Sequence, residues 1–466
     1  MTLYVSCVVA LLMVCAGLFV RNYAAKQLLL LAGSYAFYQF WGLNFLAVLI
    51  ASSFVNFYLG VWLRKRPGLG RLWVGIAFNI LALGVFKYVP AHDIVMPAGM
   101  SFWTFQAMSY LFDIYHEDEM DPSLLEFCLY MAFWPTVLMG PICRMPRMLP
   151  QFRKTGGFVA SNVELGSQRI VVGLFMKLVL AQILGPIVNR SFDQAGKVWG
   201  GLDAWLLAIG FGFQLFFDFA GYSNIVIGAA KMFGFQLEEN FNSPYLSLSP
   251  SVFWTRWHMS LSSWIRDYVF VPMAALFRSS SWRYVVLVLS MALFGLWHGA
   301  KATFLLWGIC QGVFLALHRL ILQLQRRFHV NADGRLGAFA GWAVTFAGIT
   351  LGWILFRAND LHQAGVMYGA MLSPASYRQM ELPLNYYRAL IVLVAGYFFM
   401  TAVMETRIFR RFTATLQIAE ENPSVFKLCW SNLWWAAAPP IVMLLIIAVL
   451  VLSRSATVSP FMYSAF

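Results

Sequence analysis

The chain has 466 residues, of which 60% are hydrophobic and only 11% are charged. Soluble globular domains have roughly 45–50% apolar and 25% charged residues, so this composition excludes a water-covered surface for most of the chain and makes membrane lipid its expected surroundings. The formal net charge of +13 does not indicate nucleic acid, because the basic residues stand in short clusters between apolar runs, as the positive-inside rule predicts.

Apolar runs long enough to cross a bilayer, which takes roughly 17–25 residues, recur along the chain. We predict membrane-spanning helices near residues 3–20, 27–43, 44–62, 72–88, 124–142, 168–190, 203–232, 283–297, 302–323, 338–356, 385–404 and 434–453. Two further windows, 97–115 and 245–277, are apolar and aromatic but interrupted by charged and polar residues, which predicts buried or re-entrant segments.

Four basic clusters set the expected orientation: Arg64 to Arg71, Arg144 to Lys154, Arg319 to Arg335 and Arg407 to Arg411. With 97–115 re-entrant, the predicted helices put all four clusters on one face, which the positive-inside rule makes the cytoplasmic one. No internal repeat or long polar linker is visible, so we expect one domain over 1–466. The predicted fold is an all-α polytopic membrane protein with about 11–13 transmembrane helices plus re-entrant segments.

The densest group of ionisable residues within apolar sequence runs from Phe253 to Tyr268. The group includes Trp254, Arg256, Trp257, His258 and Arg266. Arginine recognises phosphate with its planar fork, and aromatic rings stack on flat ligand groups, so the mixture suits a cavity wall for an anionic ligand. An aromatic interface belt with arginines reaching toward water is an equally good interpretation.

Two further groups hold single titratable residues. His298 follows Trp297 at the end of an apolar run and stands between Gly295 and Gly299. Histidine can take a proton from a hydroxyl near neutral pH, although a histidine at a helix end is more often structural. Asp218 is an intramembrane carboxylate that either orients a histidine, pairs with an arginine, or forms a buried ion pair that holds helices together. The six cysteines form no CxxC pair, and no metal site is expected.

These stretches, in this order, resemble the membrane-bound O-acyltransferase family and its alginate-acetylase-like branch. The resemblance covers roughly residues 86–358 and is carried by Phe86-Lys87-Tyr88, Pro97 to Gln106, Gly140-Pro141-Ile142 with Arg144, the Asp218 block, Asn240 to Tyr245, Phe253 to His258, Leu296 to Gly299 and Trp353 to Ala358. Thr255 departs from the family, which usually has a basic residue there, and Asn224 stands where an aspartate is common.

The resemblance implies roles that spacing does not give. His298 would be the catalytic base in a tunnel through the membrane, with His258 nearer the cytoplasmic mouth. No cofactor would be bound, and acetyl-CoA or another acyl thioester would be the donor, held by the group around Trp254. Dipoles near Trp297 and Asn242 would stabilise the oxyanion. The implied activity is O-acylation of a surface polysaccharide from the bacterial inner membrane. Teichoic-acid D-alanylation and a transporter without chemistry are the alternatives.

The chain ends in an aromatic hexapeptide, Phe461 to Phe466, within a tail over 454–466. Composition favours a simple interface anchor, since tyrosine and phenylalanine rest at headgroup depth. The family resemblance implies instead that Tyr463 accepts the acyl group from the tunnel. Tyr463 would then pass the acyl group to a periplasmic SGNH-type serine acetyltransferase, which serves the polysaccharide acceptor.

Overall fold

The computed structural model describes residues 20, 22–89, 95–116, 120–154, 159–194, 197, 199–277, 279–329 and 334–405, and these residues form helices without a β-strand. Within them, seven helices are long and apolar enough to cross a membrane, over residues 43–65, 69–88, 161–193, 201–232, 302–327, 335–357 and 384–403. An all-α polytopic membrane protein is therefore confirmed. The predicted helices near 3–20 (apart from Val20) and 434–453, and the tail with Tyr463, lie outside the described residues.

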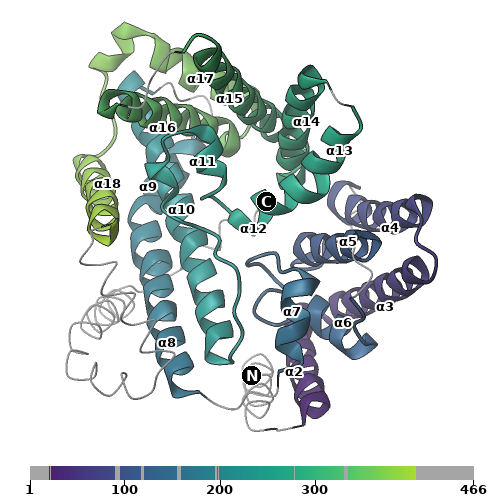
Figure 1. Ribbon diagram of the computed structural model, residues 1–466. Coiled ribbons are helices and arrows are strands. Elements are labelled where there is room, and N and C mark those ends of the chain that lie inside the picture. Colours follow the sequence, from purple (N-terminus) through teal and green to yellow (C-terminus); the bar gives the residue numbers. More distant parts are fainter. Residues whose placement is uncertain are drawn as a thin grey trace. The chain divides into compact units, whose positions relative to one another are not determined.

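The chain forms two compact units, whose boundaries fall inside two long helices, α8 (Ala160–Phe175) and α10 (Gly201–Met232). The first unit spans 1–170 and 226–240, and the second spans 171–225 and 241–466. In the first unit (Figure 1) lie α2 (Tyr23–Tyr38), η1 (Gln39–Trp41), α3 (Leu43–Lys65), α4 (Leu69–Tyr88), α5 (Met100–His116), α6 (Leu124–Ala132) and α7 (Met145–Phe152).

The second unit follows α8 with a π-helical turn, η2, that leads directly into α9. Its remaining elements are η2 (Met176–Leu180), α9 (Ala181–Asp193), η3 (Pro244–Leu246), α11 (Pro250–Trp254), α12 (Met259–Ile265), η4 (Arg266–Phe270), α13 (Val271–Ala275), α14 (Ser280–His298), α15 (Ala302–Arg327), α16 (Arg335–Arg357), α17 (Leu361–Leu372), η5 (Pro374–Arg378) and α18 (Leu384–Glu405). The segment 245–277, predicted to be buried or re-entrant, is thus a series of short helices.

Helix α5 passes through the first unit and is buried on all sides. Fourteen of its seventeen residues are buried. The Tyr38 hydroxyl, at the end of α2, donates a hydrogen bond to the Ala98 carbonyl just before α5, at 2.6 Å. Beyond the other end of α5, Asp121 forms an ion pair with Arg64 at the end of α3. Because α3 begins beside the end of α2, these contacts lie at opposite ends of α3, and α5 runs between them as one continuous buried helix.

The burial predicted for 97–115 is confirmed in α5, and the turning back that was its alternative occurs in the next segment. Helix α6 ends at Ala132, and residues 133–144 are not helical. The Tyr130 hydroxyl donates to the Cys143 carbonyl at 2.9 Å, so the chain has turned back beside itself. The predicted span 124–142 is therefore wrong, and this stretch is a re-entrant hairpin. The chain therefore turns back once in this region, as predicted, but after α5 and not within it. The Arg144 to Lys154 cluster accordingly still lies at the Arg64 end of the unit.

Gly99 fixes the depth of this hairpin. Its φ of +72° is a left-handed conformation, and a Cβ atom there would lie 1.9 Å from the Val137 carbonyl oxygen. Only glycine lets the hairpin backbone approach the start of α5 so closely. The tip of the hairpin therefore packs at the Tyr38 end of α5, while both of its legs return to the Arg64 end.

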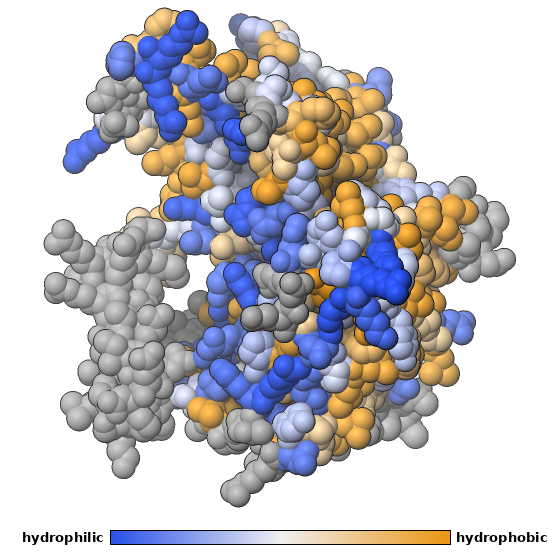
Figure 2. Space-filling view, turned by 45° about the vertical axis from the view of Figure 1, so that its right-hand side comes forward, coloured by the Kyte–Doolittle hydropathy of each residue, from blue (hydrophilic) through white to orange (hydrophobic). Residues whose placement is uncertain are grey.

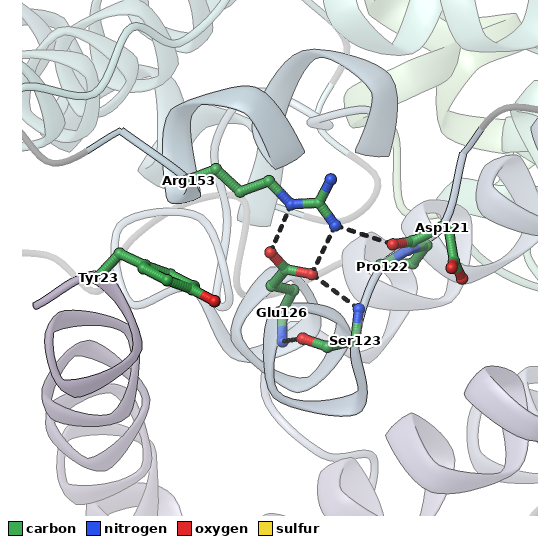
Figure 3. Close-up of a pocket in the computed structure, with 6 residues that line it drawn as sticks. All are labelled: Tyr23, Asp121, Pro122, Ser123, Glu126 and Arg153. Atoms are coloured by element: carbon green, nitrogen blue, oxygen red, sulfur yellow. Dashed lines mark hydrogen bonds and ion pairs between the residues drawn. The ribbon is translucent and has the colours of Figure 1, made fainter.

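Glu126 anchors the open end of the hairpin (Figure 3). Its carboxylate accepts two hydrogen bonds from Arg153, at 2.7 and 3.0 Å, and one from the Ser123 backbone N–H at 2.7 Å. Arg153 also donates to the Asp121 carbonyl at 2.8 Å. These groups line a cavity of about 460 Å³ that Tyr23 borders. Burial raises the pKa of Glu126, but the hydrogen bonds from Arg153 and Ser123 outweigh it and lower the pKa.

Loss of Arg153 should therefore destabilise the protein in a pH-dependent way. The Glu126 side chain is 5% exposed, and Arg153→Met leaves its charge buried without the guanidinium. A carboxylate with a lowered pKa stabilises the fold above its unfolded pKa and stops doing so as pH falls through the folded pKa. We expect the melting temperature of Arg153→Met in detergent to fall well below wild type at pH 7, with a gap that narrows toward pH 4.

A second ion pair in the same unit supplies the control. Arg147 donates to Glu238 at 2.5 Å, but the Arg147 side chain is 69% exposed. Exposed pairs contribute little, so Arg147→Met should melt close to wild type at both pH values. If the difference in melting temperature between wild type and Arg153→Met did not change with pH, the destabilisation could not be assigned to the buried charge of Glu126.

Hydrophobic side chains form broad areas of the molecular surface (Figure 2). They include outward-facing residues of the long helices, such as Leu81 of α4, Leu293 of α14 and Val392 of α18. Such apolar surface is expected of helices whose outer faces contact lipid.

Candidate active site

His298 lies at a tight junction between two helices, α14 and α15, which pack side by side (Figure 1). A Cβ atom on Gly295 would lie 2.2 Å from the Phe304 carbonyl oxygen, and one on Gly308 would lie 2.2 Å from the Met291 carbonyl oxygen. Helix α14 ends at His298, and α15 begins at Ala302. The two glycines thus allow the backbones of α14 and α15 to approach closely beside His298.

Aromatic rings enclose the imidazole of His298, and the residue is only 3% exposed. Its ring centroid lies 4.7–5.9 Å from the rings of Phe294, Trp297, Phe304, Trp307 and Phe356. These rings come from α14, α15 and α16, so tertiary packing creates the enclosure. A site closed by rings excludes water and strengthens every electrostatic interaction inside it.

His258 is fully buried at a bend between α11 and α12. Its φ of 42° places it in the left-handed region. The preceding residues are held by backbone pairing, with the Asn242 N–H donating to the Arg256 carbonyl at 3.0 Å. The imidazole meets the Phe219 ring at right angles, with centroids 4.7 Å apart. Burial lowers the pKa of His258 to about 3, so the imidazole is neutral at physiological pH.

The same ring cluster joins the two histidine motifs. Trp257, next to His258, lies 4.9 Å from Trp353, which lies 5.7 Å from Phe356, and Phe356 contacts His298. The structure thereby brings together two motifs that are 298 − 258 = 40 residues apart. The predicted importance of the Trp353 to Ala358 stretch now has a physical basis, because its rings connect both histidines.

A cavity of about 330 Å³ opens beside this cluster. Trp254 and Phe294 form its inner wall, and both rings belong to the enclosure: Trp254 lies 5.5 Å from Phe294 and 5.9 Å from Trp307. Arg266 and Arg319 also line it. Arg266 is paired with Asp267 at 2.7 Å, and the Arg319 guanidinium lies over the Phe270 ring at 5.4 Å. The cavity therefore combines two cations with an apolar end near His298.

The predicted donor-binding residues fall into two sets. Trp254 and Arg266 line the cavity. Trp257 is buried inside the ring cluster, and Asn242 and Arg256 meet through the backbone at the bend before His258. Arg319 was expected from the sequence to belong only to a topogenic cluster, and its place in the cavity was not predicted. The signal in the sequence was that Arg319 lies in a row of residues spaced four apart on α15, with Trp307 at its other end and positions 311 and 315 between them.

Asp218 forms an ion pair with Lys177. The expected arginine partner is thus a lysine, and the interpretation as an ion pair between helices holds. Lys177 lies on the π-helical turn η2, where α8 passes α10 closely: a Cβ on Gly173 would lie 2.5 Å from the Gly221 carbonyl oxygen. Asp218 also neighbours Phe219, whose ring contacts His258, so the pair fixes the helix against which that histidine packs.

Comparison with known proteins places the chain among acyltransferases. The model of the membrane-bound O-acyltransferase family matches residues 98–357. A probable alginate O-acetylase of Pseudomonas fluorescens is 35% identical over 368 residues, covering 77% of this chain and 72% of the relative. A peptidoglycan O-acetyltransferase of Helicobacter pylori is 30% identical, covering 74% and 73%. A teichoic acid D-alanyltransferase of Bacillus subtilis is 28% identical, covering 59% and 71%.

Proposed function

Since this chain belongs to the membrane-bound O-acyltransferase family and is an acyltransferase, we propose that it moves an acetyl group from a cytoplasmic thioester toward a cell-surface polysaccharide. The relatives named for alginate and peptidoglycan acetylation support this choice of acyl group and acceptor. Alginate, acetylated cellulose and peptidoglycan are the candidate polymers. Membership of an acyltransferase family removes the transporter alternative, and D-alanyl transfer to teichoic acid is the second candidate, favoured by the 28% identical relative.

The enclosure of His298 is the observation that carries the proposal. His298 acts as the general base and takes the proton of an acceptor hydroxyl. The hydroxyl oxygen attacks the thioester carbonyl carbon, and the tetrahedral intermediate collapses with cleavage of the carbon–sulfur bond. The departing sulfur takes the proton back from His298, which returns to its neutral form. Because the rings exclude water, hydrolysis of the thioester does not compete.

The cavity beside the enclosure is the proposed donor site. Arg319 and, once it exchanges its Asp267 partner, Arg266 provide cationic forks that bind the phosphates of acetyl-CoA. Trp254 and Phe294 lie between these cations and His298, so a donor anchored by its phosphates directs its acyl end toward the imidazole. This donor site belongs on the cytoplasmic side, and the inner membrane is the proposed location.

Transfer from purified protein tests the function directly. Proteoliposomes of the full chain, incubated with radiolabelled acetyl-CoA and oligosaccharide acceptors, should release free CoA and move label to protein or acceptor. D-alanyl carrier-protein thioester serves as the competing donor. Label transfer from the D-alanyl donor alone would establish the second candidate, and transfer from neither donor would overturn both.

The C-terminal tail, outside the described residues, is the proposed acyl relay. Tyr463 accepts the acetyl group at the site and passes it to a serine of a periplasmic SGNH-type partner, so one transfer across the membrane becomes two shorter ones. We expect Tyr463→Phe to abolish polymer acetylation in cells, because it keeps the ring but removes the nucleophilic oxygen. Ser464→Ala, which removes a neighbouring hydroxyl, should acetylate normally. Wild-type acetylation by Tyr463→Phe would leave the tail as an anchor only.

A further inference from the structure

A row of residues on α15 leads from the cavity to the rings around His298. Residues spaced four apart are neighbours on a helix and form such a row, which winds slowly around the axis, and Arg319 and Leu315 in this row line the cavity. Trp307, two turns before Leu315, contacts His298 at 5.4 Å. The position between Leu315 and Trp307 is occupied by Gln311. A donor chain that follows this row from Arg319 to His298 passes Gln311.

Gln311 is a polar side chain in an apolar setting. It is 2% exposed, and its Oε1 atom has no hydrogen-bond partner among the residues that the structure describes. Its Nε2 atom lies against α16, where a Cβ on Gly352 would be only 2.3 Å away. The neighbouring rings of Trp307 and Trp353 are stacked, with centroids 6.3 Å apart. A buried polar atom without a partner is costly and calls for a functional explanation.

We infer that Gln311 binds the amide-bearing arm of the acyl thioester donor. This inference rests on the proposed function and extends it to the recognition of the donor chain. A carboxamide carries one acceptor and two donor hydrogens, which match the N–H and C=O of a secondary amide. A thioester donor of the CoA type has such amides between its phosphates and its sulfur. Gln311 occupies the corresponding stretch between Arg319, at the phosphate end, and His298, at the acyl end.

The same chain offers a matched control in Gln214 of α10. Gln214 is 4% exposed, and its Oε1 atom also has no hydrogen-bond partner in the described part of the chain. Its amide lies against Gly185 of α9, where a Cβ would meet Nε2 at 3.1 Å. The two glutamines thus share residue type, burial and an unpartnered oxygen, but of the two only Gln311 lies in the row of α15 residues that leads from the cavity to the rings around His298.

Methionine substitutions separate recognition from folding. Methionine resembles glutamine in length and has no amide to satisfy, so both Gln311→Met and Gln214→Met should melt at or above the wild-type temperature. If a glutamine has only a structural role, its replacement by methionine should change the melting temperature and leave donor binding and KM unchanged. Gln311→Met alone should weaken binding of a non-hydrolysable acetyl-CoA analogue and raise the KM for acetyl-CoA, each by about tenfold to hundredfold, since the bound amide loses its partner.

Small donors identify the group that Gln311 binds. S-acetyl-N-acetylcysteamine keeps one amide and no phosphate, whereas S-propyl thioacetate has neither. Wild type should prefer the first donor over the second, and Gln311→Met should lose that preference. If wild type is active and Gln311→Met has the same affinity for the analogue and the same KM for acetyl-CoA, the inference is overturned and the proposed function stands. Wild-type protein that transfers acetyl from no thioester would overturn both.

Discussion

Replacing His298 with alanine should lower acyl transfer by roughly 10²–10⁴-fold, the contribution of a positioned general base. No other titratable group is among the side chains whose rings enclose it. The measurement is release of CoA from acetyl-CoA by purified protein in proteoliposomes. Polymer acetylation in cells carrying the variant gives the second readout.

Packing has to be separated from chemistry in this test, because alanine leaves a void among the rings. His298→Phe fills most of that space and lacks a proton acceptor, so it should be as inactive as His298→Ala but melt closer to wild type. His362 on α17 is exposed, and His362→Ala should keep full activity. Substantial transfer by His298→Phe at its normal expression level would rule out the proposed base.

Loss of His258 should lower kcat/KM by about a hundredfold, as expected for removal of a hydrogen-bonding group at a buried site. The neutral imidazole cannot contribute positive charge to a phosphate, because burial lowers its pKa to about 3. We therefore expect it to position the donor by contact or hydrogen bonding, and the loss to appear mainly in the KM for acetyl-CoA.

The backbone at His258 decides which substitution is informative. A φ of 42° is unfavourable for alanine, at a cost of roughly 1–2 kcal/mol, whereas asparagine tolerates it. His258→Asn therefore removes the imidazole without straining the bend. His329 has a similar φ of 52° and an exposed side chain, so His329→Asn controls for the backbone and should remain fully active. His258→Asn with normal donor affinity but poor turnover would assign His258 to the chemical step instead.

Apolar run length predicted the helices that face lipid. The predicted spans 44–62, 72–88 and 302–323 lie within a few residues of α3, α4 and α15. Apolar run length also predicted α10, which is mostly buried, but it failed for two other segments that protein surrounds. Helix α5 contains Thr104, Gln106 and other polar residues that neighbouring helices cover, so its hydropathy did not predict a continuous long helix. The hairpin at 124–144 is apolar because it is buried inside the first unit, so its hydropathy wrongly predicted a membrane-spanning helix.

The site was only partly predictable for a related reason. The order and the residues of the motifs predicted a site around His298, His258 and the neighbouring tryptophans. In the structure, contacts between aromatic rings connect these residues. The contacts themselves come from four helices far apart in sequence, α11, α14, α15 and α16, and no local spacing encodes such packing. Arg319 stands beside other basic residues near a helix end, and charge alone does not distinguish a topogenic arginine from a cavity arginine.

The glycine contacts between α14 and α15 also limit how the enzyme can move. With Gly295 against the Phe304 carbonyl and Gly308 against the Met291 carbonyl, the helices have no slack to slide or separate without breaking two backbone contacts. The hairpin that carries His298 and Phe294 must therefore behave as one rigid body during turnover. Any opening that lets a thioester pass from the cavity along Gln311 to the imidazole has to come from the elements that face this hairpin, α11 to η4 and α16, or from rotation of the Phe294 ring. Labels on α12 and α15 should thus change distance during catalysis, while a pair on α14 and α15 should not.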